Sequence, residues 1–403
     1  MIIYGYEYLT SIFNQQIFRS SIDDHRRDVF VLEIKQFFIV LAAALISFAV
    51  LFPTAASACT SICLIADDGT AVCGRTMEWG TFDLNSRVAI VPRGHEFSSE
   101  TPDSKKGLTW KTRYGAVALD MIGKDYFADG LNEKGLAVNF LYLPGISEYQ
   151  PYDPAKADIS MSPAFMATYV LTQFASVDEV RKGMDKVRVV AIPEPALGGA
   201  PAPMHLMVTD KNGKVIVIEY LDGKLKISDN PVKVLTNAPS FDWHLTNLSN
   251  YVNLSAMPYP PKKIGDLTIE PSGGGSGLLG MPGDITPPSR FVRAVAQTML
   301  ARKTPDGPET VYEIFRIMDN FNHPLSTGEG TVTELQRQDG MRSSTIWTSA
   351  IDTGSLVYYY HTQHNRKVRM IDLKKIDFSP VKSGIRHLPL DRVKQQEIED
   401  ITP

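Results

Sequence analysis

A long apolar run that ends at Ala56-Ser57-Ala58-Cys59 is the feature that most constrains this chain of 403 residues. Residues 37–52 are apolar except Ser47. A run of this length is short for a membrane span of about 20 residues but typical of the core of a secretory signal. The small residues before Cys59 form the pattern after which signal peptidase cuts. We therefore predict that residues 1–58 are removed, that residues 59–403 form one domain, and that the product is secreted or periplasmic.

Two alternatives to this cleavage start from the same residues. An uncleaved apolar run would anchor the chain in a membrane, whereas cleavage would leave no stable membrane span. A lipoprotein signal also needs a cysteine at the cut, but Ala56 stands where such signals usually have leucine. The pattern favours a free Cys59 over both alternatives.

A cysteine at the start of a chain carries two reactive groups on one residue. A free α-amino group has an unperturbed pKa of about 7.7 to 8.0 and a thiol one of about 8.5. The amine can therefore accept the thiol proton, and no histidine is required as a base. Cleavage before Cys59 would place a nucleophile and its base in one residue.

Composition excludes several other classes of protein. The formal net charge is −4, so there is no basic surplus to indicate nucleic acid or an anionic membrane surface as a partner. The eight histidines show no metal-binding spacing, and no glycine-rich stretch has the spacing of a phosphate-binding loop. We expect neither a metal nor an organic cofactor.

The three cysteines lie close together near the start of the mature chain. Residues 59–65 and 71–77 flank Asp67-Asp68-Gly69, which predicts a β-hairpin. Cys63 and Cys73 are equidistant from Asp68 and can face each other across this hairpin. We expect two buried free thiols at these positions, with a disulfide as the alternative.

Strand and helix patterns alternate in blocks along the rest of the chain. Helices are predicted at residues 164–174, 176–184, 288–302 and 308–320, the second beginning with a capping box of Ser176 and Glu179. Further strands are predicted at residues 88–91, 116–122, 135–143, 204–209, 215–221, 225–227, 232–235, 345–352, 356–363 and 368–373. This order favours two sheets covered by helices over separate sheet and helix domains.

Two loops are long enough to have roles of their own. Residues 196–203 (ALGGAPAP) predict a mobile loop that can border a site. Residues 259–283 are rich in proline and glycine, which is typical either of a linker or of an ordered surface loop used in assembly.

Four stretches place polar residues at the ends of predicted strands or helices. They are residues 74–79, 132–142, 235–239 and 282–291. Together with Cys59, they resemble the choloylglycine hydrolase family of N-terminal-nucleophile amidases, which includes bile salt hydrolases and penicillin V acylases. The resemblance covers nearly all of residues 59–375. It implies an α+β fold, a four-layer αββα sandwich, and a homo-oligomer that hydrolyses the linear carbon–nitrogen bond of a small-molecule amide.

The resemblance also implies roles for the residues of the first motif. Cys59 matches the nucleophile that forms an acyl-enzyme, and Arg75 matches the arginine beside the thiol. Glu78 stands where the family usually has an aspartate that holds the α-amino group. Because glutamate is one methylene longer, either its side chain must retreat or another carboxylate, such as Asp83, must serve.

The remaining motifs match residues around the reacting carbonyl. Asn237 matches the asparagine that helps bind the oxyanion, and the backbone N–H of Tyr142 can complete that site. Arg290 matches the second arginine of the family's site, with Arg293 expected at the surface. The same resemblance leaves Trp243 and His244 as packing and structural residues.

The substrate follows less directly from these residues. Tyr142, with Phe140 and Trp79 nearby in the motifs, favours a penicillin V acylase that can also accept N-acyl homoserine lactones. A bile salt hydrolase is the second interpretation, because one residue supplies only modest discrimination. A third is a lipidated binding protein without catalysis, since acylation of the Cys59 amine would remove the base.

Overall fold

The computed structural model describes residues 59–80, 83–325, 344–380 and 382–403. Residues 1–53 and 54–403 form two units, and every described residue belongs to the second. The predicted signal segment, residues 1–58, therefore lies outside the described residues. A search of the described helices finds none with the length and apolar character to cross a membrane.

The first large sheet contains the strand that follows Cys59 directly. Within the described residues it has six strands in the order β14-β1-β2-β17-β18-β19. The bounds in chain order are β1 Thr60–Ile65, β2 Ala71–Trp79, β14 Val234–Leu235, β17 Ser344–Asp352, β18 Val357–Thr362 and β19 Arg369–Asp372.

In the part of the chain that the structure describes, the second large sheet has eight strands in the order β13-β12-β11-β8-β7-β6-β3-β20. The bounds are β3 Arg87–Val91, β6 Ala116–Met121, β7 Tyr126–Asn132, β8 Ala137–Tyr142, β11 Met204–Thr209, β12 Val215–Leu221, β13 Lys224–Asp229 and β20 Arg386–Pro389. Three smaller pairs complete the strands: β4 Glu96–Glu100 with β5 Lys106–Lys111, β9 Ser160–Met161 with β10 Arg188–Val189, and β15 Lys262–Ile264 with β16 Leu267–Ile269.

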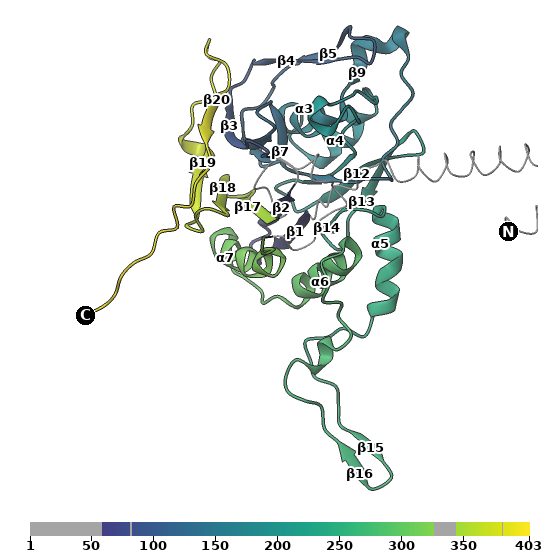
Figure 1. Ribbon diagram of the computed structural model, residues 1–403, viewed down its shortest axis with the longest axis vertical. Helices are drawn as coiled ribbons and strands as arrows, with labels where there is room; N and C mark the ends of the chain where they lie inside the picture. Colours follow the sequence, from purple (N-terminus) through teal and green to yellow (C-terminus); the bar gives the residue numbers. More distant parts are fainter. Residues whose placement is uncertain (1–58, 81–82, 326–343, 381) are drawn as a thin grey trace, which may run out of the picture. The chain divides into compact units, whose positions relative to one another are not determined.

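Helices cover the outer face of each large sheet. α3 (Met166–Gln173) contacts β7 and β8, while α6 (Pro287–Leu300) and α7 (Gly307–Met318) contact β1, β2 and β17. Strand β18 of one sheet contacts β7 of the other, so the sheets face each other between the helical layers (Figure 1). The expected α+β fold, a four-layer αββα sandwich, is confirmed. The other helical segments are α4 Val177–Met184, α5 Phe241–Asn247, η1 Pro154–Ile159, η2 Pro163–Phe165, η3 Pro195–Leu197, η4 Leu248–Tyr251, η5 Ser276–Leu278, η6 Asp319–Phe321 and η8 Leu373–Lys375.

Local signals in the sequence account for the helix starts. The Ser176 hydroxyl accepts a hydrogen bond from the Glu179 N–H at 3.3 Å, and the Glu179 carboxylate accepts one from the Ala175 N–H, one residue before the cap. Helix α6 begins with two prolines in its first turn, where a missing N–H costs no intrahelical bond. The capping residues therefore determine where these helices begin, in addition to the apolar faces that pack on the sheets.

The hairpin of β1 and β2 corrects one expectation from the sequence. Cys63 and Cys73 are direct partners in its register and form a disulfide. The expectation of two free thiols was wrong, and the alternative was right, because the turn at Gly69 places both side chains on the same face of the hairpin.

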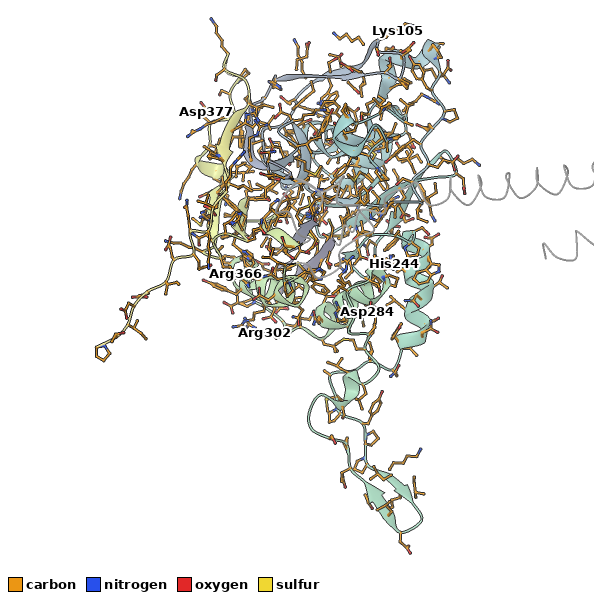
Figure 2. All side chains as sticks on the ribbon, in the orientation of Figure 1. Lys105, His244, Asp284, Arg302, Arg366 and Asp377 are labelled. Carbon is orange, nitrogen blue, oxygen red and sulfur yellow. A yellow bond between two sulfur atoms is a disulfide. The ribbon has the colours of Figure 1, made fainter. Side chains whose placement is uncertain are left out.

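The proline- and glycine-rich stretch at residues 259–283 is an ordered projection rather than a linker. It carries the hairpin of β15 and β16, whose side chains stand apart from the packed body of the protein (Figure 2). Ile264 and Leu267 near its tip are 58% and 63% exposed. A role in assembly remains a prediction.

Candidate active site

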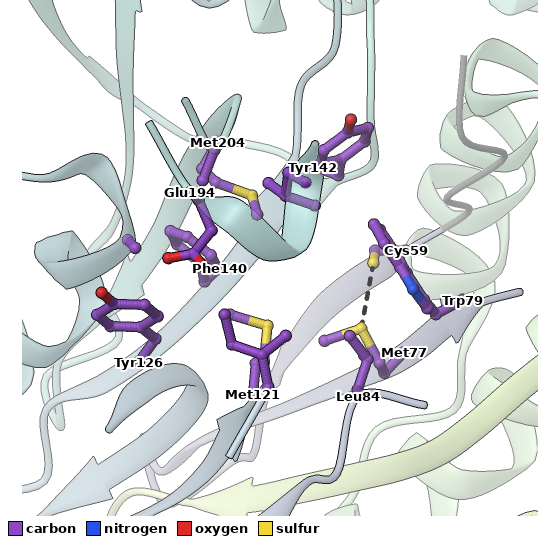
Figure 3. A pocket seen from close by; sticks show the side chains of 14 residues that line it. Cys59, Met77, Trp79, Leu84, Met121, Tyr126, Phe140, Tyr142, Glu194 and Met204 are labelled. Atoms are coloured by element: carbon purple, nitrogen blue, oxygen red, sulfur yellow. Dashed lines mark hydrogen bonds between the residues drawn. The ribbon is translucent and has the colours of Figure 1, made fainter. Parts of the chain in front are cut away.

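Cys59 lies immediately before β1 and is buried, with 2% of its surface exposed. Its Sγ accepts a hydrogen bond from Arg75 Nη2 at 3.1 Å and lies 3.9 Å from Met77 Sδ (Figure 3). Cys63 and Cys73 are joined to each other, so among the described cysteines Cys59 is the one outside a disulfide. A guanidinium in contact with sulfur stabilises the thiolate, which is the reactive form.

Arg75 is held rigidly on β2. Its Nη1 donates to the backbone oxygens of Ala128 at 2.7 Å and Phe140 at 2.8 Å, which lie on strands of the opposite sheet. The guanidinium carbon also lies 5.0 Å from the centre of the Trp347 ring. The charge of Arg75 also acts on two buried carboxylates, because it opposes the rise that burial causes in the pKa of Asp129 and of Glu78.

Arg290 links the start of α6 to the nucleophile. Its Nη1 donates to the backbone oxygen of Cys59 and to Thr60 Oγ1, the latter at 2.8 Å. Its Nη2 donates to Asn237 Oδ1 at 2.7 Å. Burial lowers the pKa of Arg290 to about 10, and the neighbouring Glu78 opposes this shift. The side chain is therefore a cation at neutral pH.

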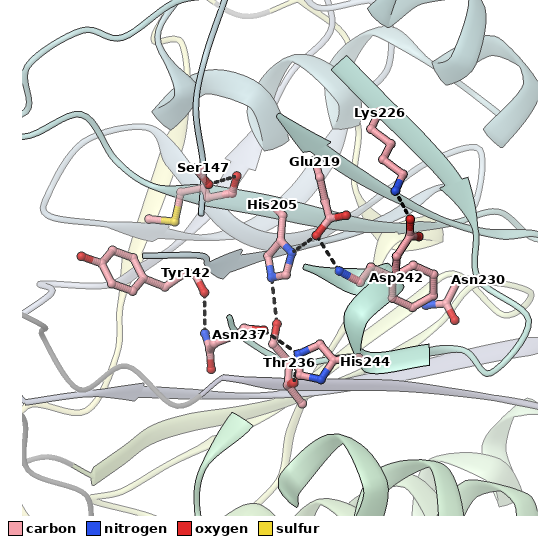
Figure 4. Close-up of polar contacts among 12 residues, drawn as sticks. Tyr142, Ser147, His205, Glu219, Lys226, Asn230, Thr236, Asn237, Asp242 and His244 are labelled. Atoms are coloured by element: carbon pink, nitrogen blue, oxygen red, sulfur yellow. Dashed lines mark hydrogen bonds and ion pairs between the residues drawn. The ribbon is translucent and has the colours of Figure 1, made fainter. Parts of the chain in front are cut away.

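Asn237 follows β14, and its amide is fixed from both sides. Its Oδ1 accepts from Arg290, and its Nδ2 donates to the backbone oxygen of Tyr142 at 2.7 Å (Figure 4). One N–H of the amide is used in this bond, so a second N–H is available for an oxygen of a ligand. The contact also brings the end of β8 next to the Asn237 loop.

Glu78 lies on β2 three residues after Arg75 and is fully buried. Its Oε1 accepts a hydrogen bond from Thr345 Oγ1 at 2.8 Å. Burial raises the pKa of Glu78 to about 7, while Arg290 and the hydroxyl hydrogen bonds act in the opposite direction. Asp83, the other candidate carboxylate, is exposed and accepts from the N–H of Asn85 within its own turn. The buried position beside Arg290 favours Glu78.

An apolar pocket opens from the Cys59 thiol. Water-sized groups can enter about 50 Å³ of it, several times the minimum of about 10 to 15 Å³ that one water needs. Figure 3 shows the thiol at one end, with Tyr126 and Glu194 toward the other. The lining residues are Cys59, Met77, Trp79, Leu84, Met121, Ile122, Tyr126, Phe140, Tyr142, Ala164, Glu194, Leu197, Ala202 and Met204.

Aromatic side chains shape the mouth of this pocket. Tyr142, at the end of β8, meets the edge of Trp79 with ring centres 5.8 Å apart, and Phe140 lines the same pocket. The predicted border loop at residues 196–203 is confirmed as part of the wall, because Leu197 and Ala202 line it. The lining therefore offers an apolar, partly aromatic surface beside the nucleophile.

A family of known proteins matches the part of the chain that contains these residues. The profile of the linear amide C–N hydrolases, choloylglycine hydrolase family, matches residues 59–384. The chain belongs to this family.

Individual relatives agree with that assignment. A bile salt hydrolase/transferase of Clostridium perfringens is 34% identical over 322 residues, covering 79% of this chain and 93% of that protein. A penicillin V acylase of Pectobacterium atrosepticum is 29% identical over 330 residues, covering 77% and 78% of the two chains. The crystal structure of a variant of conjugated bile acid hydrolase from Clostridium perfringens matches with a TM-score of 0.71 and 29% identity, over 85% of this chain and 100% of that one.

As a member of the choloylglycine hydrolase family, the protein is a linear amide C–N hydrolase. The structure brings the six candidate residues together, five of them through hydrogen bonds and Glu78 through its electrostatic interaction with Arg290. Cys59 contacts both arginines, Asn237 joins Arg290 to Tyr142, and Glu78 lies close enough to Arg290 for each to shift the other's pKa. The individual catalytic roles remain proposals.

One site expectation was wrong. Arg293 is not a surface residue: it is 7% exposed, its Nη1 donates to the backbone oxygens of Pro282 and Asp284, and its guanidinium lies 5.5 Å from the Phe321 ring centre. Arg293 follows Arg290 by one helical turn, so both point to the same face of α6. It holds the loop before α6 in place.

His244 is structural, as expected, but Trp243 packs on one side only. His244 Nε2 donates to the backbone oxygen of Asn237 at 2.9 Å, and the ring stacks on Phe291 with centres 4.6 Å apart. Burial lowers the pKa of His244 to about 4, so the ring is neutral. Trp243 touches His244 edge-on but is 44% exposed.

A further support for the Asn237 loop was missed in the sequence. His205, on β11, contacts the backbone oxygen of Thr236 through Nε2 at 2.8 Å and Glu219 through Nδ1 at 3.4 Å (Figure 4). Glu219 in turn accepts from the Phe241 N–H at 2.9 Å. The available signal was a pair of polar residues within two otherwise apolar strands, at positions that face the Asn237 loop.

One cluster of possible metal ligands lies outside this site. Oxygens of Asp120 and Asp125 and a nitrogen of His387 lie within 4.8 Å of one another. Arg87 already contributes a cation there, since its Nη2 lies 2.6 Å from Asp120 Oδ2. The cluster is therefore explained as an ion-pair network.

Proposed function

We propose that the mature protein is an exported cysteine amidase of the penicillin V acylase type, which also accepts N-acyl homoserine lactones. Cleavage after Ala58 would free the α-amino group of Cys59. That amine takes the thiol proton, and the thiolate adds to the amide carbonyl. The C–N bond then breaks, the ammonium proton passes to the leaving amine, and water hydrolyses the thioester to release the acid.

The contacts of the site support a role for each neighbouring residue. Arg75 stabilises the thiolate through its 3.1 Å contact with sulfur. Asn237, oriented by Arg290, offers an N–H to the oxyanion. The bond from its Nδ2 to the Tyr142 oxygen holds the end of β8 beside this amide, and the Tyr142 N–H is the second donor of the proposed mechanism. Glu78 holds the Cys59 ammonium in the mature enzyme.

The observation that carries the choice of substrate is the lining of the pocket. The lining beside the thiol includes the rings of Trp79, Phe140 and Tyr142, an apolar surface that suits a phenoxyacetyl group or a straight acyl chain. A four-ring bile acid needs a wide cleft, so this aromatic lining favours the acylase over the bile salt hydrolase.

A bile salt hydrolase is the second candidate because of the relatives. The Clostridium perfringens bile salt hydrolase/transferase is 34% identical to this chain, against 29% for the penicillin V acylase. A difference of this size in sequence identity does not separate two substrates of the same reaction. A lipidated binding protein is the third candidate, since acylation of the Cys59 amine would abolish the proposed base.

Amine release from penicillin V, glycocholate and a long-chain N-acyl homoserine lactone tests the proposal, with Cys59→Ser as the blank. Faster cleavage of penicillin V or the lactone supports it, whereas faster cleavage of glycocholate favours the second candidate. Intact mass tests export and processing: the mass of residues 59–403 with an unmodified amine supports the mechanism. A lipid increment on Cys59, or a retained leader in the periplasmic fraction, contradicts it.

A further inference from the structure

The acyl pocket contains one charged residue among its lining side chains, Glu194. Glu194 is 6% exposed, and both of its carboxylate oxygens accept hydrogen bonds from Lys124 Nζ, at 2.9 and 3.0 Å. A buried carboxylate is costly unless a cation and hydrogen bonds compensate it. Because an apolar residue at position 194 would avoid this cost, we expect the function of Glu194 to lie in the ion pair itself.

The two partners belong to different walls of the pocket. Lys124 lies in the turn between β6 and β7, whose neighbours Met121, Ile122 and Tyr126 line one side. Glu194 begins the loop that contributes Leu197 and Ala202 to the other side. The ion pair thus connects the two walls directly.

The ion pair is what connects the first half of this loop, residues 194–200, to the rest of the protein by polar contacts. Within the described chain, every other hydrogen bond of residues 194–200 stays inside the segment, such as Glu194 N–H to the Ala200 oxygen at 3.1 Å and Leu197 N–H to the Glu194 oxygen at 2.9 Å. Gly198 and Gly199 at its tip have positive φ angles of 68° and 85°. The segment is a self-contained turn, fastened to the opposite wall by Lys124.

We propose that the ion pair of Lys124 and Glu194 is a latch that holds residues 194–203 closed across the pocket and so limits the width of the acyl group. Breaking the latch lets an unpaired carboxylate turn toward water, and Leu197 moves with it. The wider pocket then admits bulkier groups. This proposal rests on the proposed function for the assignment of the pocket to the acyl group.

The test compares Lys124→Met and Glu194→Gln with Lys124→Arg, which keeps the cation. Glu194→Gln leaves no buried unpaired charge and retains an oxygen for the Ala196 N–H, so it guards against misfolding of the first variant. The control is Lys214→Met, which removes another ion pair, with Asp178 at 2.8 Å, between residues that do not line the pocket.

The first measurement is the alkylation of Cys59 by N-phenylmaleimide relative to iodoacetamide, which requires no turnover. We expect Lys124→Met and Glu194→Gln to raise the ratio of the two rates about 10-fold, the discrimination that one methylene of pocket space can provide. Lys124→Arg and Lys214→Met should keep the wild-type ratio. Equal ratios in Lys124→Met, Glu194→Gln and Lys214→Met would overturn the latch.

The second measurement is the ratio of kcat/KM for glycocholate to that for penicillin V. The latch predicts that it rises in Lys124→Met and Glu194→Gln, and a parallel loss for both substrates contradicts it. If the wild-type protein cleaves no amide in the panel, the proposed substrate is wrong, while the alkylation ratio still decides the latch.

Discussion

Asn237→Asp is the substitution that isolates the proposed oxyanion donor. The variant keeps an oxygen that can accept from Arg290 Nη2, a bond of 2.7 Å in the wild-type structure. It loses both N–H groups, including the one that donates to the Tyr142 oxygen at 2.7 Å. The change therefore removes donors from the site while it preserves the attachment of Arg290.

The expected loss follows from the number of donors removed. A preorganised oxyanion donor contributes about 2.7 to 4 kcal/mol, which corresponds to a decrease of about 10² to 10³ in kcat. The new carboxylate also places negative charge where the oxyanion forms, so the upper half of this range is expected. KM should change little, because the donor acts mainly on the transition state.

Asn237→Ala provides the matched comparison. It removes the donors and also leaves Arg290 Nη2 without its acceptor, a buried loss of about 1 to 3 kcal/mol in the free energy of unfolding. We expect both variants to lose kcat, and Asn237→Ala to lose more stability in urea denaturation. If Asn237→Asp retains more than a tenth of the wild-type kcat on the best substrate, the oxyanion assignment fails.

Three further predictions concern the charges and cysteines around the site. In Arg75→Lys, the single ammonium cannot contact the two backbone oxygens and the thiol together. Loss of a charge-assisted bond of about 1.5 to 3 kcal/mol should slow the alkylation of Cys59 by iodoacetamide about 10- to 150-fold. An unchanged rate would contradict the contact between Arg75 and the thiol. Burial lowers the pKa of His323 from 6.5 to about 4. As the pH falls, His323 therefore takes up its proton in the unfolded chain at a higher pH than in the folded protein. About 3 kcal/mol of stability, fully present above pH 6.5, is therefore lost as the pH falls to 4. His323→Leu should show a flatter dependence of the free energy of unfolding on pH, and parallel curves would refute this. Thiol counting on the denatured mature protein without reductant should give one free thiol, because Cys63 and Cys73 are bonded; three would contradict the disulfide.

Local patterns predicted the part of the site that lies within one hairpin. The turn at Asp67-Asp68-Gly69 sets the register in which Ser61 opposes Arg75, two residues from Cys59. The hairpin therefore implied that Arg75 lies near the start of β1, while the resemblance supplied its contact with the thiol. Arg290 reaches Cys59 across 231 positions of the chain, and no local pattern fixes such a contact. Only the resemblance to a family predicted it.

One strand, β7, was missed for a physical reason. Strand β7 contains Asp129 and Gly130, which interrupt an apolar strand pattern. Asp129 is nevertheless buried, because the hydroxyls of Ser349 and Tyr358 donate to its carboxylate from the opposite sheet. The partners that make this strand stable come from more than 200 positions away, so its own sequence could not reveal it.

Glu78 shows how the fold accommodates a departure from the family's usual aspartate. Thr345 is the direct partner of Glu78 in the pairing of β17 with β2, and its hydroxyl donates to the carboxylate at 2.8 Å. This bond ties the carboxylate to the adjacent strand, and Arg290 lies near enough to oppose the rise in its pKa. If cleavage occurs before Cys59, we expect the longer side chain to reach the new amine from this position. This partner of Glu78 lies in a strand 267 positions away, which explains why the motif alone left open whether Glu78 or Asp83 serves.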